Sequence, residues 1–333
     1  MKIIHCADLH LDAAMTSVLG REKARERKAE LLHTFERMVS YADSHDVTGI
    51  IIAGDLFDRK KISATALHTV KAAITAHPDI CFYYLRGNHD TGSFPGSPED
   101  VADNLKLFSD HWITYVMKTG EKKEIAISGA ELNRENATTI YDTIPTNRDR
   151  FHIVTLHGQT TEHTKGGAET IHLRKLRNKG IDYLALGHIH AYRTGALDSR
   201  GRYCYAGCLE GRGFDECGAH GFVLLDIDTE SGTFTQEFIP IAERSLYTVE
   251  IDISGCMTTT EISEKLKQVL LDMNFDEKNL IKIILKGGVD VACEKNLELL
   301  TRKMEDECYF IKIYDETTVR VDYHTYALDE SLK

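Results

Sequence analysis

The sequence has no long apolar run, and this absence excludes membrane-spanning and secreted classes of protein. No stretch of its 333 residues approaches the ~20 consecutive apolar residues that a membrane-spanning helix requires. A secretory signal is not expected either, because the polar residues Asp8 and His10 stand where its apolar core would have to lie. We therefore expect a cytoplasmic protein that makes no membrane contact.

Nucleotide-binding and repeat signatures are also missing from the chain. It contains no GxxxxGK phosphate-binding loop, no internal repeat and no heptad array. Any motor activity driven by a nucleoside triphosphate would therefore have to reside in another polypeptide.

None of the eight cysteines forms a CxxC motif. The clustered cysteines are Cys204, Cys208 and Cys217, and a structural zinc site there would need His220 as its fourth ligand. Buried free thiols are the favoured interpretation, because cysteine commonly packs as a small apolar residue. This cysteine usage fits a reducing cytoplasm.

Basic residues are outnumbered by acidic ones, 40 against 52, which gives a formal net charge of −12. This balance argues against a protein that coats nucleic acid non-specifically, because phosphate binding relies on Lys and Arg. The basic run over residues 21–28 is interleaved with Glu22 and Glu26. It is interpreted as a solvated helix face with internal ion pairs, rather than as a nucleic-acid contact.

Short apolar runs and helical patterns predict alternating strands and helices through much of the chain. The predicted strands cover residues 2–7, 49–53, 80–85, 151–156, 181–186, 202–205, 222–227, 237–241, 247–253, 281–286 and 309–314. The predicted helices cover residues 22–44, the segment between Ser63 and Pro78, 260–273 and 295–304. The three predicted strands between residues 202 and 241 are expected to form a sheet that opposes the first one.

Residues 242–246 are the predicted boundary between two domains. The first, over residues 1–245, is expected to be catalytic. The second, over residues 246–333, is expected to be a small α+β cap that contacts substrate or a partner.

Five short motifs of metal-binding residues follow one another in the sequence. They are Asp8-x-His10, Gly54-Asp55-Leu56-Phe57-Asp58, Gly87-Asn88-His89-Asp90, His157-Gly158 and Gly187-His188-Ile189-His190. Each lies at the carboxyl end of a predicted apolar strand, where loops from neighbouring strands converge. Carboxylate, amide and imidazole ligands suit a pair of divalent ions that act on phosphate oxygens. One such motif among sixteen histidines would indicate little, but the ordered set predicts a metal site.

These motifs, in this order, resemble the calcineurin-type metallophosphoesterase superfamily over residues 1–245. Three segments resemble its DNA-repair exonuclease branch, which includes bacterial SbcD: residues 4–11 (IHCADLHL), 54–58 (GDLFD) and 205–212 (YAGCLEGR). The resemblance implies a fold of the α+β or α/β class. We expect a four-layer metallophosphoesterase-type β-sandwich flanked by helices, followed by the small C-terminal cap.

The resemblance also implies which side chains hold two ions. One ion would be held by Asp8, His10 and His190. The second would be held by Asn88, His157 and His188, with Asp55 bridging both. Because Asn88 is neutral, the two carboxylates offset only part of the charge of two divalent ions. The remaining positive charge would attract a phosphodiester anion.

Two further residues receive roles from the resemblance, and a third is a candidate because it follows soon after the His188-x-His190 motif. His89 would be the catalytic residue that acts on the leaving oxygen, and Asp90 would orient its ring. Arg212 is a candidate for binding the substrate phosphate. Its loop departs from the family, because Ala206-Gly207-Cys208 stands where related enzymes commonly have Pro-Gly-Ser.

The function implied by the resemblance is metal-dependent hydrolysis of DNA phosphodiesters by an exonuclease or endonuclease in DNA repair. Manganese is the implied ion, and iron or zinc would also satisfy these ligands, whereas the four imidazoles disfavour magnesium. An SMC-like ATPase partner and a homodimer are implied as well.

Two other functions remain open. One is a phosphomonoesterase or a small-molecule or cyclic-nucleotide phosphodiesterase, which the acidic net charge favours. The other is a non-catalytic scaffold that binds a partner, and the complete Asn88-His89-Asp90 segment argues against it.

Overall fold

The computed structural model describes residues 1–15, 19–58, 62–90, 94, 102–118, 123–163, 167 and 169–320. The chain divides into two compact units. The first contains Met1–Arg212 and Ala219–Glu243, and the second contains Gly213–Gly218 and the chain from Arg244 onward. The end of the predicted cap, residues 321–333, lies outside the described residues. No sequence pattern had indicated that the short segment 213–218 belongs with the second unit.

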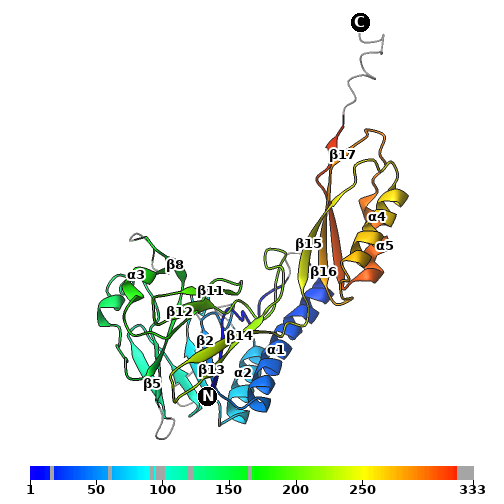
Figure 1. The fold of residues 1–333 in the computed structure, drawn as a ribbon. Coiled ribbons are helices and arrows are strands. Elements are labelled where there is room, and N and C mark those ends of the chain that lie inside the picture. Colours follow the sequence, from blue (N-terminus) through cyan, green and yellow to red (C-terminus); the bar gives the residue numbers. More distant parts are fainter. Residues whose placement is uncertain are drawn as a thin grey trace. The chain divides into compact units, whose positions relative to one another are not determined.

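Two six-stranded sheets form the centre of the first unit (Figure 1). The first sheet consists, in spatial order, of Phe234–Pro240 (β14), Gly221–Ile227 (β13), Lys2–Cys6 (β1), Val47–Ala53 (β2), Cys81–Leu85 (β3) and Leu105–Leu107 (β4). The second consists of Arg193–Ala196 (β11), Arg202–Tyr205 (β12), Tyr183–Gly187 (β10), Phe151–His157 (β7), Ile125–Gly129 (β6) and Ile113–Met117 (β5). Ile51 and Tyr83 of the first sheet share one apolar core with Ile153 and Ala185 of the second. The predicted β-sandwich is therefore confirmed.

Helices flank both sheets of this sandwich. The helix Arg21–Ser44 (α1) packs against β2 and against the helix Ala64–Ala76 (α2). Ser63 caps α2 as its spacing predicts, because its side chain accepts a hydrogen bond from the Ala66 N–H at 3.2 Å. On the second sheet, the short helices Leu173–Leu176 (α3) and Ile140–Thr143 (η2) contribute to a separate apolar cluster. A pair of short strands, Gln159–Thr161 (β8) and Thr170–His172 (β9), completes the unit.

The predicted division of strands between the sheets is wrong. β13 and β14, which follow residue 200, extend the first sheet, because β13 pairs with β1 in antiparallel orientation. The opposing sheet already contains β7 and β10, and it includes β5 and β6, which no sequence pattern had predicted. Periodicity indicates that a segment is extended, but it does not identify the segment with which that strand pairs.

The interpretation of the basic run as a solvated face is wrong at Arg27. This side chain is 1 % exposed, although the residues around it, Arg25 and Glu26, are exposed. Its guanidinium lies 3.1 Å from a carboxylate oxygen of Glu210, which is distant in sequence. A helix face that appears fully charged in sequence can therefore hide one residue that is buried by a remote segment.

The cysteine cluster contains free thiols, as predicted, but they are not all buried. Cys204 and Cys208 are buried, whereas Cys217 is exposed. The Cys208 sulfur lies 3.2 Å from Nδ1 of His220. Within the described ranges, no group of three or more potential metal ligands gathers at these cysteines.

The second unit is a small α+β arrangement with its own apolar core. Its parallel sheet consists of Leu246–Asp252 (β15), Leu280–Lys286 (β16) and Phe310–Asp315 (β18). The helices Thr259–Asp272 (α4) and Leu297–Met304 (α5), the turn Glu305–Glu307 (η3) and the paired strands Gly288–Val289 (β17) and Thr318–Val319 (β19) complete it. α4 begins with a capping box between Thr258 and Glu261.

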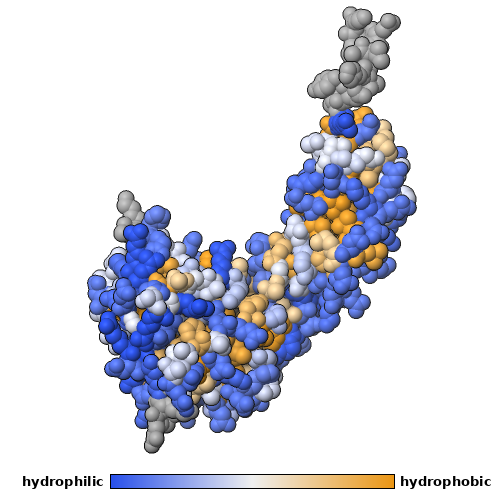
Figure 2. Space-filling view, in the orientation of Figure 1, coloured by the Kyte–Doolittle hydropathy of each residue, from blue (hydrophilic) through white to orange (hydrophobic). Residues whose placement is uncertain are grey.

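Apolar surface is exposed on the second unit among charged side chains, as Figure 2 shows. Among the described residues of this unit, the most exposed large apolar residues are Val291, which is 76 % exposed, and Leu271, which is 68 % exposed. Among the described residues, no helix combines the length and the apolar character needed to cross a bilayer.

Two buried histidines make the stability of this fold depend on pH. Nδ1 of His5 lies 2.9 Å from the Tyr183 hydroxyl, and Nε2 of His152 lies 2.8 Å from the Ser128 hydroxyl. Burial lowers the pKa of His5 to about 3 and the pKa of His152 to about 4. Both rings are therefore neutral in the folded protein at neutral pH.

We expect the free energy of unfolding to fall as the pH drops below 6.5, the ordinary pKa of histidine. Below that pH the two histidines take up protons in the unfolded chain but stay neutral in the folded chain. This difference persists until the pH reaches their pKa values in the folded state. Each histidine should contribute about 1.4 kcal/mol of lost stability per pH unit. Urea unfolding at about pH 7 and about pH 5 measures the effect, and His152→Gln should reduce it. An equal loss of stability in both proteins would contradict the prediction.

Candidate metal centre

Side chains from both sheets converge where their parallel strands end. β1, β2 and β3 run parallel in the first sheet, and β7 and β10 run parallel in the second. Each of these strands ends at, or leads directly into, a predicted ligand. The seven predicted ligands that follow these strands are Asp8, His10, Asp55, Asn88, His157, His188 and His190.

The backbone at this convergence is strained. Asp8, His10, Asp55 and His188 adopt left-handed conformations with φ of 52°, 44°, 52° and 98°. Such conformations cost roughly 1–3 kcal/mol each for residues other than glycine. Hydrogen bonds between the segments hold them, since the Asp8 N–H donates to the Gly54 carbonyl at 3.0 Å and the His10 N–H to the Asp55 carbonyl at 2.9 Å. Strain of this kind is typical of functional sites.

Two glycines in the motifs are required by close packing around the ligands. Gly54 has a φ of +95°, and a Cβ there would lie 2.1 Å from Nδ1 of His157. A Cβ on Gly87 would lie 2.2 Å from Oδ1 of Asp55. Any side chain at either position would displace a predicted ligand.

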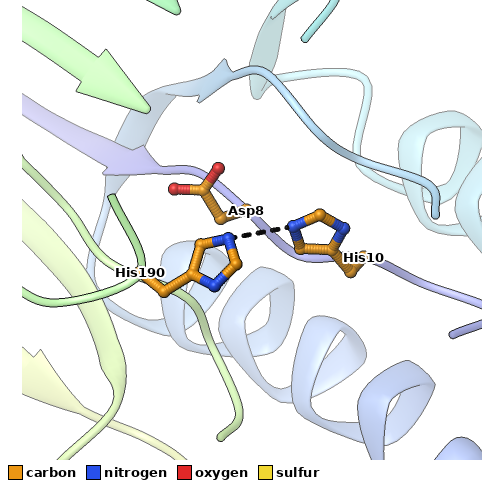
Figure 3. A group of neighbouring side chains, drawn as sticks. All are labelled: Asp8, His10 and His190. Carbon is orange, nitrogen blue, oxygen red and sulfur yellow. Dashed lines mark hydrogen bonds between the residues drawn. The ribbon is translucent and has the colours of Figure 1, made fainter. Parts of the chain in front are cut away.

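One group of predicted ligands contains Asp8, His10 and His190 (Figure 3). Their ligand atoms all lie within 4.8 Å of one another. Nε2 of His10 and Nε2 of His190 face each other at 3.3 Å. A cation between these two nitrogens could accept both lone pairs, which suits a borderline divalent ion.

A second group lies around His157. Its Nε2 is 3.3 Å from Oδ2 of Asp55 and 3.0 Å from Oδ1 of Asn88. The His188 ring lies beside it, with the two ring centroids 5.4 Å apart. The same Asp55 oxygen is 3.7 Å from Nε2 of His10 in the first group. The structure thus brings all seven side chains together with Asp55 between the groups, while their roles as ligands remain a prediction.

The electrostatics of the centre favour a cation. Asp8 and Asp55 are each 1 % exposed. Burial raises the pKa of Asp8; it also opposes ionisation of Asp55, but the hydrogen bond from His157 holds the pKa of Asp55 at about 2. Burial opposes a charge on His157 as well, yet the Asp55 hydrogen bond and the charges of Asp8 and Asp55 raise its pKa to about 9. A proton on His157 therefore neutralises part of a negative site, and ion binding would replace it.

The role that the resemblance implies for Asp90 needs correction. In the described chain its carboxylate accepts hydrogen bonds from the backbone N–H groups of Leu56, Phe57 and Gly87, at 3.1, 2.8 and 3.0 Å, and not from the His89 ring. Burial raises the pKa of Asp90 to about 6. Asp90 therefore ties together the two loops that carry Asp55 and His89.

Asp58 is the carboxylate that lies beside His89. Its Oδ1 is 3.5 Å from Nδ1 of His89, and it also accepts a hydrogen bond from Nδ1 of His10 at 3.0 Å. The His89 side chain is 46 % exposed, so it can meet a substrate. Asp58 belongs to the Gly54–Asp58 motif, but the sequence pattern alone indicates no role for it. The available indication was its fixed distance, three residues after Asp55.

Arg212 lies at the edge of the same centre. Its Nη2 is 3.1 Å from Nδ1 of His190, and its Nη1 is 3.4 Å from Oδ1 of Asp58. The side chain is 21 % exposed. This position agrees with a contact to substrate phosphate, which remains a prediction.

The chain is similar in sequence to known phosphoesterases and to proteins named for DNA repair. A family model described as calcineurin-like phosphoesterase matches residues 1–192. A relative from Aeropyrum pernix named DNA double-strand break repair protein Mre11 is 23% identical over 316 residues, covering 87% of this chain and 74% of the relative. The protein of the same name from Saccharolobus solfataricus is 26% identical over 360 residues, covering 98% and 86%. An uncharacterized metallophosphoesterase of Bacillus subtilis, YhaO, is 28% identical over 253 residues, covering 72% and 60%.

Replacing Gly87 with Ala should weaken metal binding without unfolding the sandwich. The new methyl group would displace the Asp55 carboxylate, and we expect a loss of affinity of roughly tenfold or more. Titration calorimetry with Mn²⁺ measures this change. The matched control is Gly20→Ala, because a Cβ on Gly20 meets nothing within 4 Å. Equal affinities in the two variants would contradict the proposed place of Asp55.

Proposed function

This chain belongs to the calcineurin-like phosphoesterase family, as its motifs predict, and we propose that it is a metal-dependent nuclease that hydrolyses phosphodiester bonds in DNA. The observation that carries this proposal is the meeting of two groups of ligand atoms around Asp55. Similarity over most of the chain to proteins named for DNA double-strand break repair supports DNA as the substrate.

In this proposal the two groups hold two divalent ions. Asp8, His10 and His190 would hold one ion, and Asn88, His157 and His188 would hold the other. Asp55, which lies between the two groups, would contribute to both. Two such ions, when bound, lower the pKa of a water molecule and neutralise phosphate oxygens. The mixed oxygen and imidazole donors fit manganese, iron or zinc better than magnesium. We propose manganese as the activating ion.

The protein's own residues then prepare the site for the reaction. Asp58 accepts a hydrogen bond from Nδ1 of His10, which leaves Nε2 of that ring free to bind an ion. The exposed His89 ring donates a proton to the leaving oxygen, and Oδ1 of Asp58 lies 3.5 Å from Nδ1 of that ring, where it can fix the ring's orientation. Asp90 acts through the loops that it holds.

The partners implied by the resemblance are part of the proposal. We propose that an SMC-like ATPase subunit is the partner and supplies any motor activity driven by ATP, since the chain has no GxxxxGK phosphate-binding loop of its own. We also propose that the nuclease works as a homodimer. Copurification with such a subunit and light scattering test these two points separately.

A second candidate function keeps the same chemistry on a smaller ester. The net charge of −12 favours a phosphomonoesterase or a small-molecule phosphodiesterase, because long nucleic acids are repelled by acidic surfaces. Similarity to the uncharacterized metallophosphoesterase YhaO is compatible with either substrate class.

Variants of His89 and Asp55 should separate catalysis from metal binding. His89→Ala should retain its ions and lower turnover by about 10²–10⁴-fold, because it removes the proton donor. Asp55→Ala should lose both ions, because it removes the side chain that faces both groups. Metal analysis and kinetics on a nitrophenyl phosphodiester provide the measurements. An ion-free His89 variant would show that His89 has been given the wrong role.

Salt should separate the two substrate classes. A nuclease that contacts several phosphates should lose activity on an oligonucleotide by more than about tenfold between about 50 and 200 mM salt. Hydrolysis of the nitrophenyl ester serves as the internal control, and it should change little. A flat salt response on DNA would favour the smaller ester.

A further inference from the structure

A buried ionic group includes Glu210, which lies two residues before Arg212 in the chain. We call it the Arg27 cluster, and it consists of Arg27, Glu30, Thr34 and Glu210. The side chains of Arg27 and Glu210 are 1 % and 0 % exposed. The Arg27 guanidinium donates to Glu30, to Glu210 at 3.1 Å and to the Gly211 carbonyl at 2.8 Å.

Glu210 is fixed through both of its carboxylate oxygens. Oε2 accepts from Arg27, and Oε1 accepts from the Thr34 hydroxyl at 2.7 Å and from the Glu243 backbone N–H. An apolar replacement of a buried ion pair is often neutral or stabilising, so stability alone does not explain such a cluster. Its directional hydrogen bonds instead fix the path of the chain around residue 210.

The cluster holds the segment that carries Arg212. Arg27 bonds the carbonyl of Gly211, the residue directly before Arg212. At the other end of the segment, the Cys208 N–H donates to the His190 carbonyl at 3.1 Å. The backbone before Arg212 is thus bonded on one side to helix α1 and on the other to the loop of His190.

We propose that Arg27 and Glu210 are positioning residues that hold Arg212 beside the metal centre, where its guanidinium donates hydrogen bonds to a non-bridging phosphate oxygen. This inference rests on the proposed hydrolysis of phosphodiesters. A guanidinium binds phosphate through paired, directional hydrogen bonds, so its benefit depends on a fixed position. A shift of the Gly211 backbone would move Arg212 away from His190 and Asp58.

A double-mutant cycle on Arg27 and Arg212 tests this coupling. The variants are Arg27→Met, Arg212→Ala and the double variant, and the control is Arg25→Ala, which removes an exposed charge from the same helix. The probe is a fluorescent oligonucleotide with phosphorothioate linkages, and anisotropy in the presence of Mn²⁺ gives its affinity. Each single variant should bind about tenfold more weakly, and the double variant no more weakly than Arg212→Ala. All variants should keep the wild-type metal content.

If the double variant bound the oligonucleotide about a hundredfold more weakly than wild type, the two single losses of affinity would have multiplied. This result would overturn the proposal, because Arg27 would then act independently of Arg212. Unchanged binding by Arg27→Met would overturn it as well. If Arg27→Met fails to fold, Arg27→Lys serves the same cycle, since a lysine keeps the charge but not both the Glu210 and Gly211 bonds. A metal-loaded wild-type protein that neither binds nor cleaves any phosphodiester would instead overturn the proposed function, and this inference with it.

Discussion

The interaction on which the centre depends is the balance of charge around two buried carboxylates, Asp8 and Asp55. Each is 1 % exposed at the end of a strand of the first sheet. A buried carboxylate is costly unless positive charge or hydrogen-bond donors surround it. The second sheet supplies them: His157 bonds Asp55, and the His188 backbone N–H donates to both oxygens of Asp8, at 2.9 and 3.0 Å. Packing of the sandwich and construction of the site are therefore one event.

A layer of supporting side chains fixes this centre from outside. Asp90 ties two of the ligand loops together through backbone N–H groups, and Asp58 sets the orientation of His10. On the far side, Arg27 and Glu210 fix the backbone that leads to Arg212. His89 is exposed and Arg212 is partly exposed, and these are the two groups that would meet a substrate. In the proposed function, the arrangement separates residues that hold the site from residues that would act on a substrate.

Local patterns predicted most of the strands and the side chains that the structure brings together at their ends, because each motif couples an apolar run to the polar residues that end it. Contacts between distant segments could not be predicted in this way. Arg27 and Glu210 are 183 residues apart, and nothing near either one indicates that they meet. The pairing of β13 with β1 and the role of Asp58 depend on the same kind of remote contact. Asp90 was given the wrong contact because sequence proximity to His89 does not determine where a carboxylate points.

Because the candidate ligands come from strand ends of both sheets, ion binding by the newly made protein depends on how far it has folded. A half-formed chain with only one sheet in place has no complete pocket for an ion. A complete ion site therefore exists only once the two sheets have associated. The ions bound would then be those available to the folded protein. The same polypeptide could carry different ions under different conditions of growth.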